Sequence, residues 1–303
     1  MLIMTKSALT SDEKRRIQSD LKAYVATYPS QAKAANSLKG TSAGTVNFIV
    51  NGKFDNISDE MFLKIAAQVR RCGDGWQVCQ TSAYKDVETI LSDSQTYHNV
   101  AWVVAPAGIG KTTAALRYAS ERRHVFVLGC SEDMHKSDFV EELARKIGIR
   151  SEGLTVRGTL VRVTEALVKR QNPLLVFDEA DKLTDSVLYY FISLYNALEG
   201  KCGIVFLSTQ YIERRMSRGL RLDKKGYEEL YSRIGRRFIP LSPVSAYEVN
   251  AICRSNGLTD EASIRRVIAE SREIRNGSDE FDLRRVRKSI HKQMRLASAN
   301  VQA

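Results

Sequence analysis

The stretch NVAWVVAPAGIGKTTAALRYASER, Asn99–Arg122, determines how the rest of the chain is interpreted. An apolar run through Val104 leads into the loop Ala105–Thr112, and a helical pattern follows. This order is typical of a phosphate-binding loop, whose pattern is G-x-x-x-x-G-K-[ST]. Ala105 replaces the first glycine of that pattern. Because Ala105 directly follows the strand, we expect its methyl group to cost little unless the residue needs a positive φ.

The loop has the residue types that phosphate binding requires. Gly108 and Gly110 allow backbone N–H groups to turn inward around the phosphates, and the next helix points its N-terminus at them. Lys111 is expected to meet the β- and γ-phosphates, and Thr112 to give an oxygen ligand to Mg²⁺. The sequence therefore predicts ATP and Mg²⁺ as ligands. The predicted nucleotide-binding residues in the loop are Pro106, Ala107, Gly108, Ile109, Gly110, Lys111, Thr112 and Thr113.

The second half of the predicted site is PLLVFDEAD, Pro173–Asp181. A buried apolar strand that ends in two carboxylates places them at the carboxyl end of a sheet, beside the loop. Asp178 can hold the hydration shell of Mg²⁺, and Glu179 can orient and polarise the attacking water. An acidic pair after an apolar run is a weak signal alone. Together with the loop, in this order, it predicts ATP hydrolysis.

The letters DEAD, Asp178–Asp181, also occur in a family of RNA helicases. Such a helicase needs a second nucleotide-fold domain downstream, and the chain left beyond the predicted sheet is too short for one. The next strand ends in FLSTQ, where Thr209 (or Ser208) fits the polar sensor that the AAA+ class carries on its fourth strand. The sequence therefore resembles AAA+ ATPases, and we expect Asp181 to begin the following helix.

From Asn99 onward apolar runs alternate with helical patterns, which predicts a parallel α/β sheet. After Pro243 the chain is expected to be helical and polar, as in an AAA+ lid. The predicted strands are NVAWVVA (99–105), HVFVLGC (124–130), PLLVFDEA (173–180), CGIVFLST (202–209) and RFIPLSP (237–243).

Arginines gather before the last predicted strand, in YEELYSRIGRRFIPL. AAA+ proteins carry there an arginine finger that reaches a neighbour's γ-phosphate, which can raise the rate about 10³–10⁵-fold. We prefer Arg233 for this role over Arg236 and Arg237, with a solvated basic edge or DNA contact as the alternative. Later, FDLRRVRKSIHK resembles the lid helix of that class. Arg284 takes the position of its second sensor, although Phe281 replaces the usual glycine.

Short helices are expected before residue 70, in SQAKAANSLKGTSAGTVNFIVNGK and its surroundings. Helix, short glycine turn, helix is the helix-turn-helix plan, in which the second helix lies in the DNA major groove. The alternative is a small helical bundle with no DNA role. The expected boundaries are a helix capped by Ser30 through Leu38, a turn at Gly40, a helix from Thr41 or Ser42 through Val50, and a helix capped at Ser58. The candidate DNA contacts on the second helix are Ser42, Thr45 and Asn47.

The composition of the 303 residues agrees with a nucleic-acid partner. The formal net charge is +11 and the pI about 9.4, which favours a polyanionic partner, although basic residues also serve solubility. The five cysteines are scattered without metal-ligand spacing, so they are expected to be reduced thiols. No apolar run approaches the roughly 20 residues that span a bilayer. We therefore expect a cytoplasmic protein without membrane contact.

Taken together, the motifs APAGIGKTT, LLVFDEAD, FLSTQYIERRM, LYSRIGRRF and the amino-terminal helical segment resemble the B-type transposition proteins of phage Mu and its relatives. The resemblance implies an ATPase that assembles as homo-oligomeric filaments or rings on double-stranded DNA with little sequence preference. It further implies that such a protein selects target DNA and activates a DDE transposase, and that DNA and transposase stimulate hydrolysis. By the same analogy, DNA contacts would come from Lys136, Thr155, Arg157 and Thr159, with the basic stretch RRMSRGLRLDKKG as an alternative.

The predicted fold class is α/β: an AAA+ P-loop NTPase core with a parallel sheet and a helical lid, preceded by a small all-α helix-turn-helix domain. Two other functions stay open, a helicase-loader-type ATPase and a helix-turn-helix transcription regulator switched by ATP. The predicted divisions are a helix-turn-helix domain (1–70), a linker helix (71–98), the ATPase core (99–242) and the lid (243–303).

Overall fold

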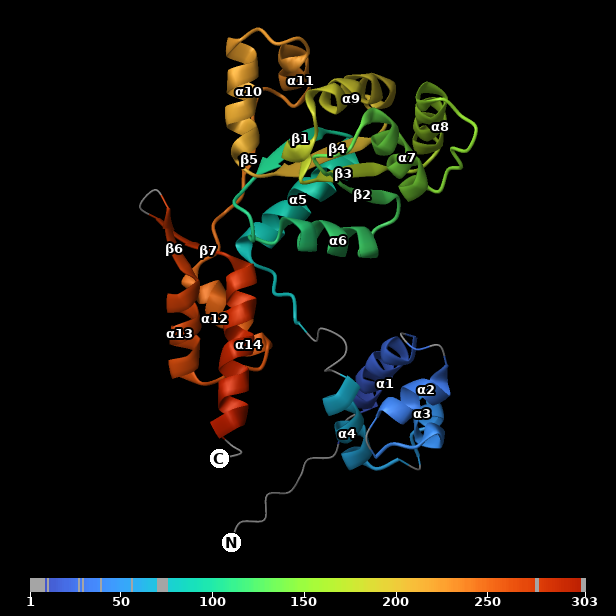
Figure 1. Ribbon diagram of the computed structural model, residues 1–303, viewed down its shortest axis with the longest axis vertical. Helices are drawn as coiled ribbons and strands as arrows, with labels where there is room; N and C mark the ends of the chain where they lie inside the picture. The colour runs from blue at the N-terminus through green and yellow to red at the C-terminus, as the bar shows by residue number, and fades with distance from the viewer. Residues whose placement is uncertain are drawn as a thin grey trace. The chain divides into compact units, whose positions relative to one another are not determined.

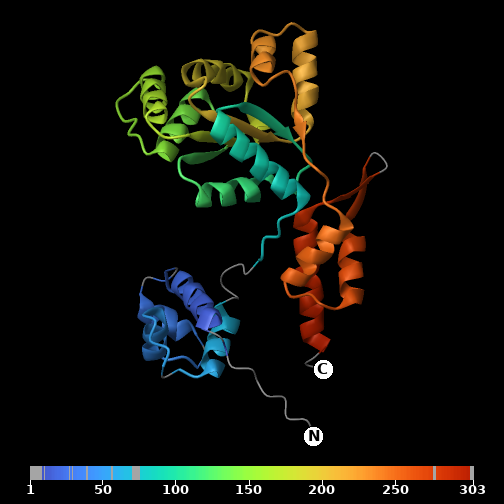
Figure 2. The ribbon, with the colours of Figure 1, turned by 180° about the vertical axis from the view of Figure 1, so that it is seen from behind.

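The computed structural model divides the chain into two compact units, residues 1–77 and 78–303, each treated by itself. Figure 1 gives the labels of the helices and strands, and Figure 2 shows the chain from behind. The residues that the structure describes are 9, 11–26, 28, 30–38, 40–55, 57–69, 76–275 and 278–300.

Unit 1 is a small helical bundle whose local boundaries agree with the sequence analysis. The Ser30 side chain accepts from the N–H of Lys33, and that of Ser42 accepts from Thr45, so both predicted N-caps are confirmed. Apolar residues at helical spacing, such as Phe62 and Ile65, are fully buried. The described helices of this unit are α1 (Ser11–Ala26), α2 (Gln31–Ser37), α3 (Ala43–Val50) and α4 (Asp59–Val69).

The core of unit 2 is a five-stranded parallel sheet with the order β2-β3-β4-β1-β5. Apolar β-branched and aromatic residues on both faces explain the continuous hydrophobic runs, because helices cover both faces of such a sheet. The prediction of an α/β fold with a parallel sheet is confirmed. The strands are β1 (Val100–Val104), β2 (Val125–Gly129), β3 (Leu174–Asp178), β4 (Gly203–Ser208) and β5 (Ile239–Pro240).

Helices α5 and α6 contact one face of the sheet, and α7, α8 and α9 pack on the other (Figures 1 and 2). Further along the chain, α10 and α11 pair with each other and α11 contacts α9. These helices, with the short 3₁₀ turn η1, are α5 (Ser82–Tyr97), α6 (Lys111–Glu121), α7 (Lys136–Ile147), α8 (Val156–Val168), η1 (Ala180–Lys182), α9 (Asp185–Leu198), α10 (Tyr211–Arg221) and α11 (Tyr227–Arg233).

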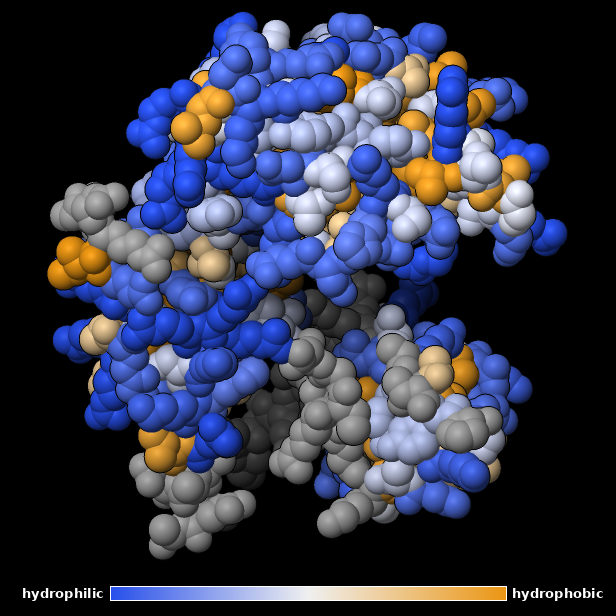
Figure 3. Space-filling model, turned by 45° about the horizontal axis from the view of Figure 1, so that its top comes forward, coloured by the Kyte–Doolittle hydropathy of each residue, from blue (hydrophilic) through white to orange (hydrophobic). Residues whose placement is uncertain are grey.

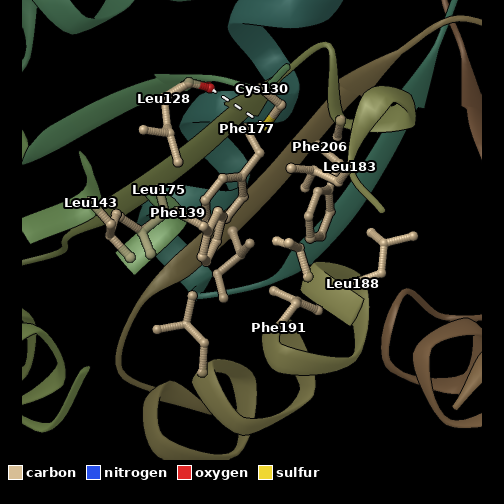
Figure 4. Packing of buried hydrophobic residues seen from close by; sticks show 14 of the residues in the cluster. Leu128, Cys130, Phe139, Leu143, Leu175, Phe177, Leu183, Leu188, Phe191 and Phe206 are labelled. Carbon is tan, nitrogen blue, oxygen red and sulfur yellow. Dashed lines mark hydrogen bonds between the residues drawn. The ribbon is translucent and has the colours of Figure 1, made fainter. Parts of the chain in front are cut away.

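Aromatic rings fill the space between the sheet and α7–α9. Phe177 stacks on Phe139 at 5.4 Å and on Phe206 at 5.3 Å between ring centroids, and Trp102 stacks on Phe206 at 4.3 Å. Figure 4 shows Phe139, Phe177 and Phe206 together with Cys130, whose thiol donates to the Leu128 carbonyl. Burial raises the pKa of the Cys130 thiol. This side chain is therefore a reduced, unreactive part of the core.

The predicted linker helix 71–98 differs from the structure. Residues 70–75 lie outside the described residues, and α5 begins only at Ser82, after the N-cap Thr81. The helix is part of unit 2, because its apolar face, including Val87 and Leu91, is buried against the sheet. A Cβ at Gly203 of β4 would lie 2.2 Å from the carbonyl oxygen of Ser94. Only glycine permits this close approach of helix and strand.

We expect Gly203→Ala to destabilise unit 2 by about 1–3 kcal/mol, since the new methyl group must push α5 away from β4. The free energy of unfolding from urea denaturation measures the effect. Gly129→Ala is the matched control, because a Cβ at Gly129 meets nothing within 4 Å and its φ is not positive. Equal stability of the two variants would contradict the packing argument.

The carboxyl-terminal part of unit 2 is the predicted lid, but it is not entirely helical. A two-stranded antiparallel hairpin separates α13 from α14. Its second strand ends in Phe281, which is buried, so the segment forms part of the lid's own core. The sequence analysis predicted helix throughout this stretch, because the segments on both sides of the hairpin have helical patterns. The lid elements are α12 (Ala246–Ser255), α13 (Glu261–Ser271), β6 (Arg272–Arg275), β7 (Ser278–Phe281) and α14 (Leu283–Asn300).

Candidate nucleotide site

The predicted phosphate loop lies between β1 and α6, at the carboxyl end of the sheet. Gly108 and Gly110 have φ values of +81° and +104°, so both use the left-handed region that favours glycine. Ala105 is not among the residues with positive φ, and its N–H donates to the carbonyl of Ser208 at 3.2 Å, continuing the β1–β4 ladder. The structure thus explains how alanine fits at the first position of the motif.

The Lys111 ammonium group is held against this loop. Its Nζ donates to the carbonyl oxygens of Ala105 at 2.7 Å and Pro106 at 2.9 Å. Burial lowers the pKa of Lys111, while the nearby carboxylates of Asp178 and Asp181 oppose this shift. A positive charge in this partly desolvated position favours binding of a polyanion such as a triphosphate.

Thr112 and Asp178 meet across the site. The Thr112 hydroxyl donates to Oδ2 of Asp178 at 2.6 Å, and the N–H of Glu179 donates to Oδ1 at 3.1 Å. Asp178 is 5% exposed, and burial raises its pKa although both hydrogen bonds act in the opposite direction. Adjacent hydroxyl and carboxylate oxygens fit Mg²⁺, which takes few protein ligands and completes its shell with phosphates and water.

Glu179 has an unusual backbone, with φ of +56° and ψ of +37°. A non-glycine residue in the left-handed region costs roughly 1–2 kcal/mol, and such strain clusters at functional sites. The carboxylate is half exposed and forms an ion pair with Lys182 at 2.7 Å, a partner that the sequence analysis missed. Because the Glu179 carboxylate is half exposed, a water molecule can reach it.

Thr209 follows β4, and its hydroxyl and N–H both donate to Oδ2 of Asp181. Asp181 lies in η1, at the start of a helical turn as expected, but its pairing with Thr209 was not expected from the sequence. Ser208, the alternative sensor, is buried and its hydroxyl accepts from the Trp102 indole. Of the two candidates for the polar sensor, Thr209 is therefore the one that hydrogen-bonds Asp181 in η1.

The lid touches the phosphate loop directly. The Leu283 N–H donates to the Gly108 carbonyl at 2.9 Å, and a Cβ at Gly108 would lie 2.0 Å from the Asp282 carboxylate. Asp282 also accepts from the N–H of Arg284 at the start of α14. Arg284 is exposed and close enough to lower the pKa of Lys111. The predicted second-sensor residue thus lies at the site, beside an aspartate that the sequence analysis did not single out.

Residues 94–216 match the family model described as an AAA domain. This chain contains an AAA domain. It is 24% identical over 260 residues to a Mu-like prophage DNA transposition protein B of Haemophilus influenzae, covering 79% of this chain and 89% of that protein. It is 23% identical over 208 residues to the ATP-dependent target DNA activator B of Escherichia phage Mu, covering 65% of this chain and 64% of that protein. The resemblance to B-type transposition proteins is confirmed.

Two solved structures were also matched. A RuvB mutant of Thermotoga maritima gives a TM-score of 0.39 with 16% identity, covering 69% of this chain and 68% of that one. NtrX from Brucella abortus gives 0.46 with 14% identity, covering 85% and 59%. As for membranes, none of the helices that the structure describes combines the length and apolar character that a crossing requires.

The three candidate finger arginines of unit 2 have different surroundings. Arg233 is held by contacts within this chain, because it donates to Asn196, pairs with Glu229 and lies over the Tyr195 ring. Arg236 is exposed and pairs with Glu228. Arg237 is exposed and lines a cavity of about 680 Å³ together with Arg233, at the amino ends of β1 and β4. The choice of Arg233 as the finger stays a prediction, although Arg237 is less constrained.

Lys136 and Arg157, two of the DNA-contact candidates, are exposed at the first turns of α7 and α8. These helices pack together, and Arg170 beyond α8 donates to the Ile147 carbonyl at the end of α7. They therefore run in the same direction, and their first turns lie toward the same end of the AAA domain. Thr155, also exposed, is the N-cap of α8.

The selection of Thr159 as a DNA contact was wrong. This residue is 2% exposed, and its hydroxyl donates to the Thr155 carbonyl one turn earlier. It lies on the face of α8 that packs inward, as Leu160 and Val163 do. A helical face buried against the domain cannot contact a ligand, so Thr159 is removed from the predicted surface.

In unit 1, the three candidate contacts lie on or beside α3. Ser42 and Asn47 are exposed and Thr45 is half-buried. Ser42 caps the helix and hydrogen-bonds the Thr45 hydroxyl, and Asn47 accepts from Asn51. The face is therefore polar and locally ordered, which fits a DNA-contacting helix, and this role stays a prediction.

We expect Gly108→Ala to weaken ATP binding about tenfold or more. The methyl group would require a strained positive φ and would displace Asp282 of the lid, which together cost roughly 1–3 kcal/mol. Titration with a fluorescent ATP analogue measures the dissociation constant, and Gly153→Ala controls for positive φ alone, since a Cβ there meets nothing within 4 Å. Equal losses in both variants would show that the lid contact has no influence.

Proposed function

We propose that this protein is an ATP-hydrolysing, DNA-binding AAA ATPase that acts in DNA transposition. It oligomerises as a filament or ring on double-stranded DNA with little sequence preference, selects target DNA and activates a DDE transposase. The observation that carries the proposal is the convergence of Lys111, Thr112, Asp178 and Glu179 at one end of the sheet. The names of the relatives support the role in transposition.

Each site residue has a separate role in the proposed hydrolysis of ATP. The loop N–H groups and Lys111 bind the phosphates. Thr112 and Asp178 would hold Mg²⁺, which would supply positive charge against the phosphate oxygens. Glu179 accepts a proton from the water whose oxygen attacks the γ-phosphorus, while the bond from that phosphorus to the bridging oxygen of ADP breaks. The hydrogen bond between Thr209 and Asp181 holds the end of β4 against the turn η1, which directly follows Glu179. Arg284 from the lid, and an arginine from a neighbouring copy, add positive charge.

Electron microscopy with double-stranded DNA and a slowly hydrolysed ATP analogue tests this function. We expect continuous assemblies on DNA of unrelated sequences, and steady-state ATP hydrolysis that rises when DNA and transposase are added. Discrete closed rings that load a helicase would instead favour a loader. A footprint on one operator sequence, with no assembly elsewhere, would favour a transcription regulator and would contradict the proposal.

The helix-turn-helix role of unit 1 has its own test. We expect a chain of residues 78–303 to bind ATP as the full chain does, because the AAA domain is a separate compact unit. Its affinity for DNA should fall about tenfold or more, since the contacts from Ser42, Thr45 and Asn47 are lost. Fluorescence anisotropy with a labelled duplex measures the change. Unchanged DNA affinity and preference would leave unit 1 as a helical bundle without a DNA role.

A further inference from the structure

Helix α10 has an exposed basic stripe that the nucleotide site does not use. The stripe consists of Tyr211, Arg214, Arg218 and Arg221, at i, i+3, i+7 and i+10 along the helix. This spacing places all of them on one face. All are exposed, and none of the arginines pairs with a carboxylate among the described residues. Hydrophilic side chains dominate the part of Figure 3 where α10 and α11 lie.

The opposite face of α10 is fixed to the AAA domain. Ile212 and Met216 are buried, and Gly219 is packed under the Tyr227 ring of α11. Arg215, which points inward, donates to the carbonyls of Asp181 and Leu183 and pairs with Asp185. Helix α10 therefore has one inward arginine with several hydrogen bonds and three outward arginines that pair with no carboxylate in the part of the chain that the structure describes.

We propose that this stripe binds the sugar-phosphate backbone of DNA. The three arginines span about 10 Å of helix axis, the length of roughly three phosphates along one strand. A guanidinium fork can bind a phosphate with two hydrogen bonds, and a tyrosine hydroxyl can add one more. Glu213, the acidic residue of α10, lies off this face, so it is not placed among the three arginines. The proposal rests on the proposed function and names the DNA surface of the AAA domain.

The position of α10 also connects this surface to ATP hydrolysis. The helix begins two residues after Thr209, whose hydroxyl binds Asp181, and Arg215 binds the carbonyl of the same aspartate. Asp181 is two residues from Glu179. DNA bound on the outer face of α10 is thus connected to Glu179 by two contacts: Arg215 of α10 binds the carbonyl of Asp181, and Thr209 before α10 binds its carboxylate. Stimulation of hydrolysis by DNA should depend on the same three arginines.

The test replaces Arg214, Arg218 and Arg221 together with glutamine. If each arginine contacts one phosphate, DNA affinity at 0.15 M salt falls about 10²-fold, and the slope of log K against log salt becomes less steep by about 2.7. ATP binding without DNA stays at the wild-type level, and stimulation of hydrolysis by DNA is lost. A matched control replaces three arginines that are already paired with carboxylates, Arg145, Arg254 and Arg272.

The measurements distinguish failure of the proposal for α10 from failure of the proposed function. An unchanged salt slope in the α10 variant, or an equal change in the control, overturns the proposal for this stripe while leaving the proposed function intact. Loss of binding to a partner protein with DNA affinity retained also overturns it and assigns the stripe to an acidic protein surface. A wild-type chain that binds ATP but no DNA under any salt condition contradicts the proposed function itself.

Discussion

A Lys111→Ala variant is expected to lose ATP binding by about 10²-fold or more, and with it any ATP-dependent assembly on DNA. Removing one partner of a desolvated charge pair costs about 2–5 kcal/mol, and each 1.4 kcal/mol is a factor of ten. Lys111 lies in such a position, because its ammonium is partly buried against the loop carbonyls. Calorimetric titration with ATP and Mg²⁺ measures the dissociation constant.

Lys169→Ala is the matched control for this measurement, since Lys169 is an exposed lysine at the end of α8. It should bind ATP as the wild type does. Near-normal ATP affinity in the Lys111 variant would contradict the assignment of the phosphate loop. Loss of ATP binding with an unfolded circular dichroism spectrum would instead indicate that the lysine maintains the fold, so the spectra of both variants must be compared first.

Glu179→Gln is expected to bind ATP normally but to lower the rate of hydrolysis about 10²–10⁴-fold, the usual contribution of a general base. Glutamine has nearly the shape of glutamate and cannot accept the proton from water. The ion pair with Lys182 is lost as well, but both side chains are substantially exposed, so that loss contributes little to stability. Phosphate release in single-turnover experiments measures the hydrolysis step.

The consequence of this substitution extends to DNA. A variant that binds ATP without hydrolysing it should stay assembled on DNA, so dissociation after dilution becomes much slower than in the wild type. Glu152→Gln, in an exposed loop, is the control and should turn over normally. Unaltered turnover in the Glu179 variant would remove this residue from the mechanism and direct attention to Asp181.

Much of this architecture is readable in the sequence because it depends on local patterns. The phosphate loop, the strand that ends at Asp178 and the serine caps of unit 1 each lie within a few consecutive residues, and period-2 or period-3.6 patterns locate them. The parallel sheet follows from the alternation of apolar runs and helices. These features were predicted with boundaries close to those observed.

Two of the features that were missed depend on residues far apart in the sequence. The Thr209–Asp181 hydrogen bond joins residues 28 positions apart, and the contact between Asp282 and Gly108 joins the lid to the loop. The burial of Thr159 was missed because a threonine near a helix start resembles a surface residue until the packing partner is known. The β6–β7 hairpin was missed because its strands are only four residues long.

The contact between Gly108 and α14 has a consequence for how the chain is made. During synthesis from the N-terminus, the phosphate loop emerges long before Asp282 and Leu283 are available, so a nascent chain has an incomplete site. Nucleotide binding then favours the complete unit by mass action: ATP at 100 times its dissociation constant stabilises the folded state by about 2.7 kcal/mol. Under the proposed function, ATP therefore stabilises the chain in which the phosphate loop and α14 are both folded.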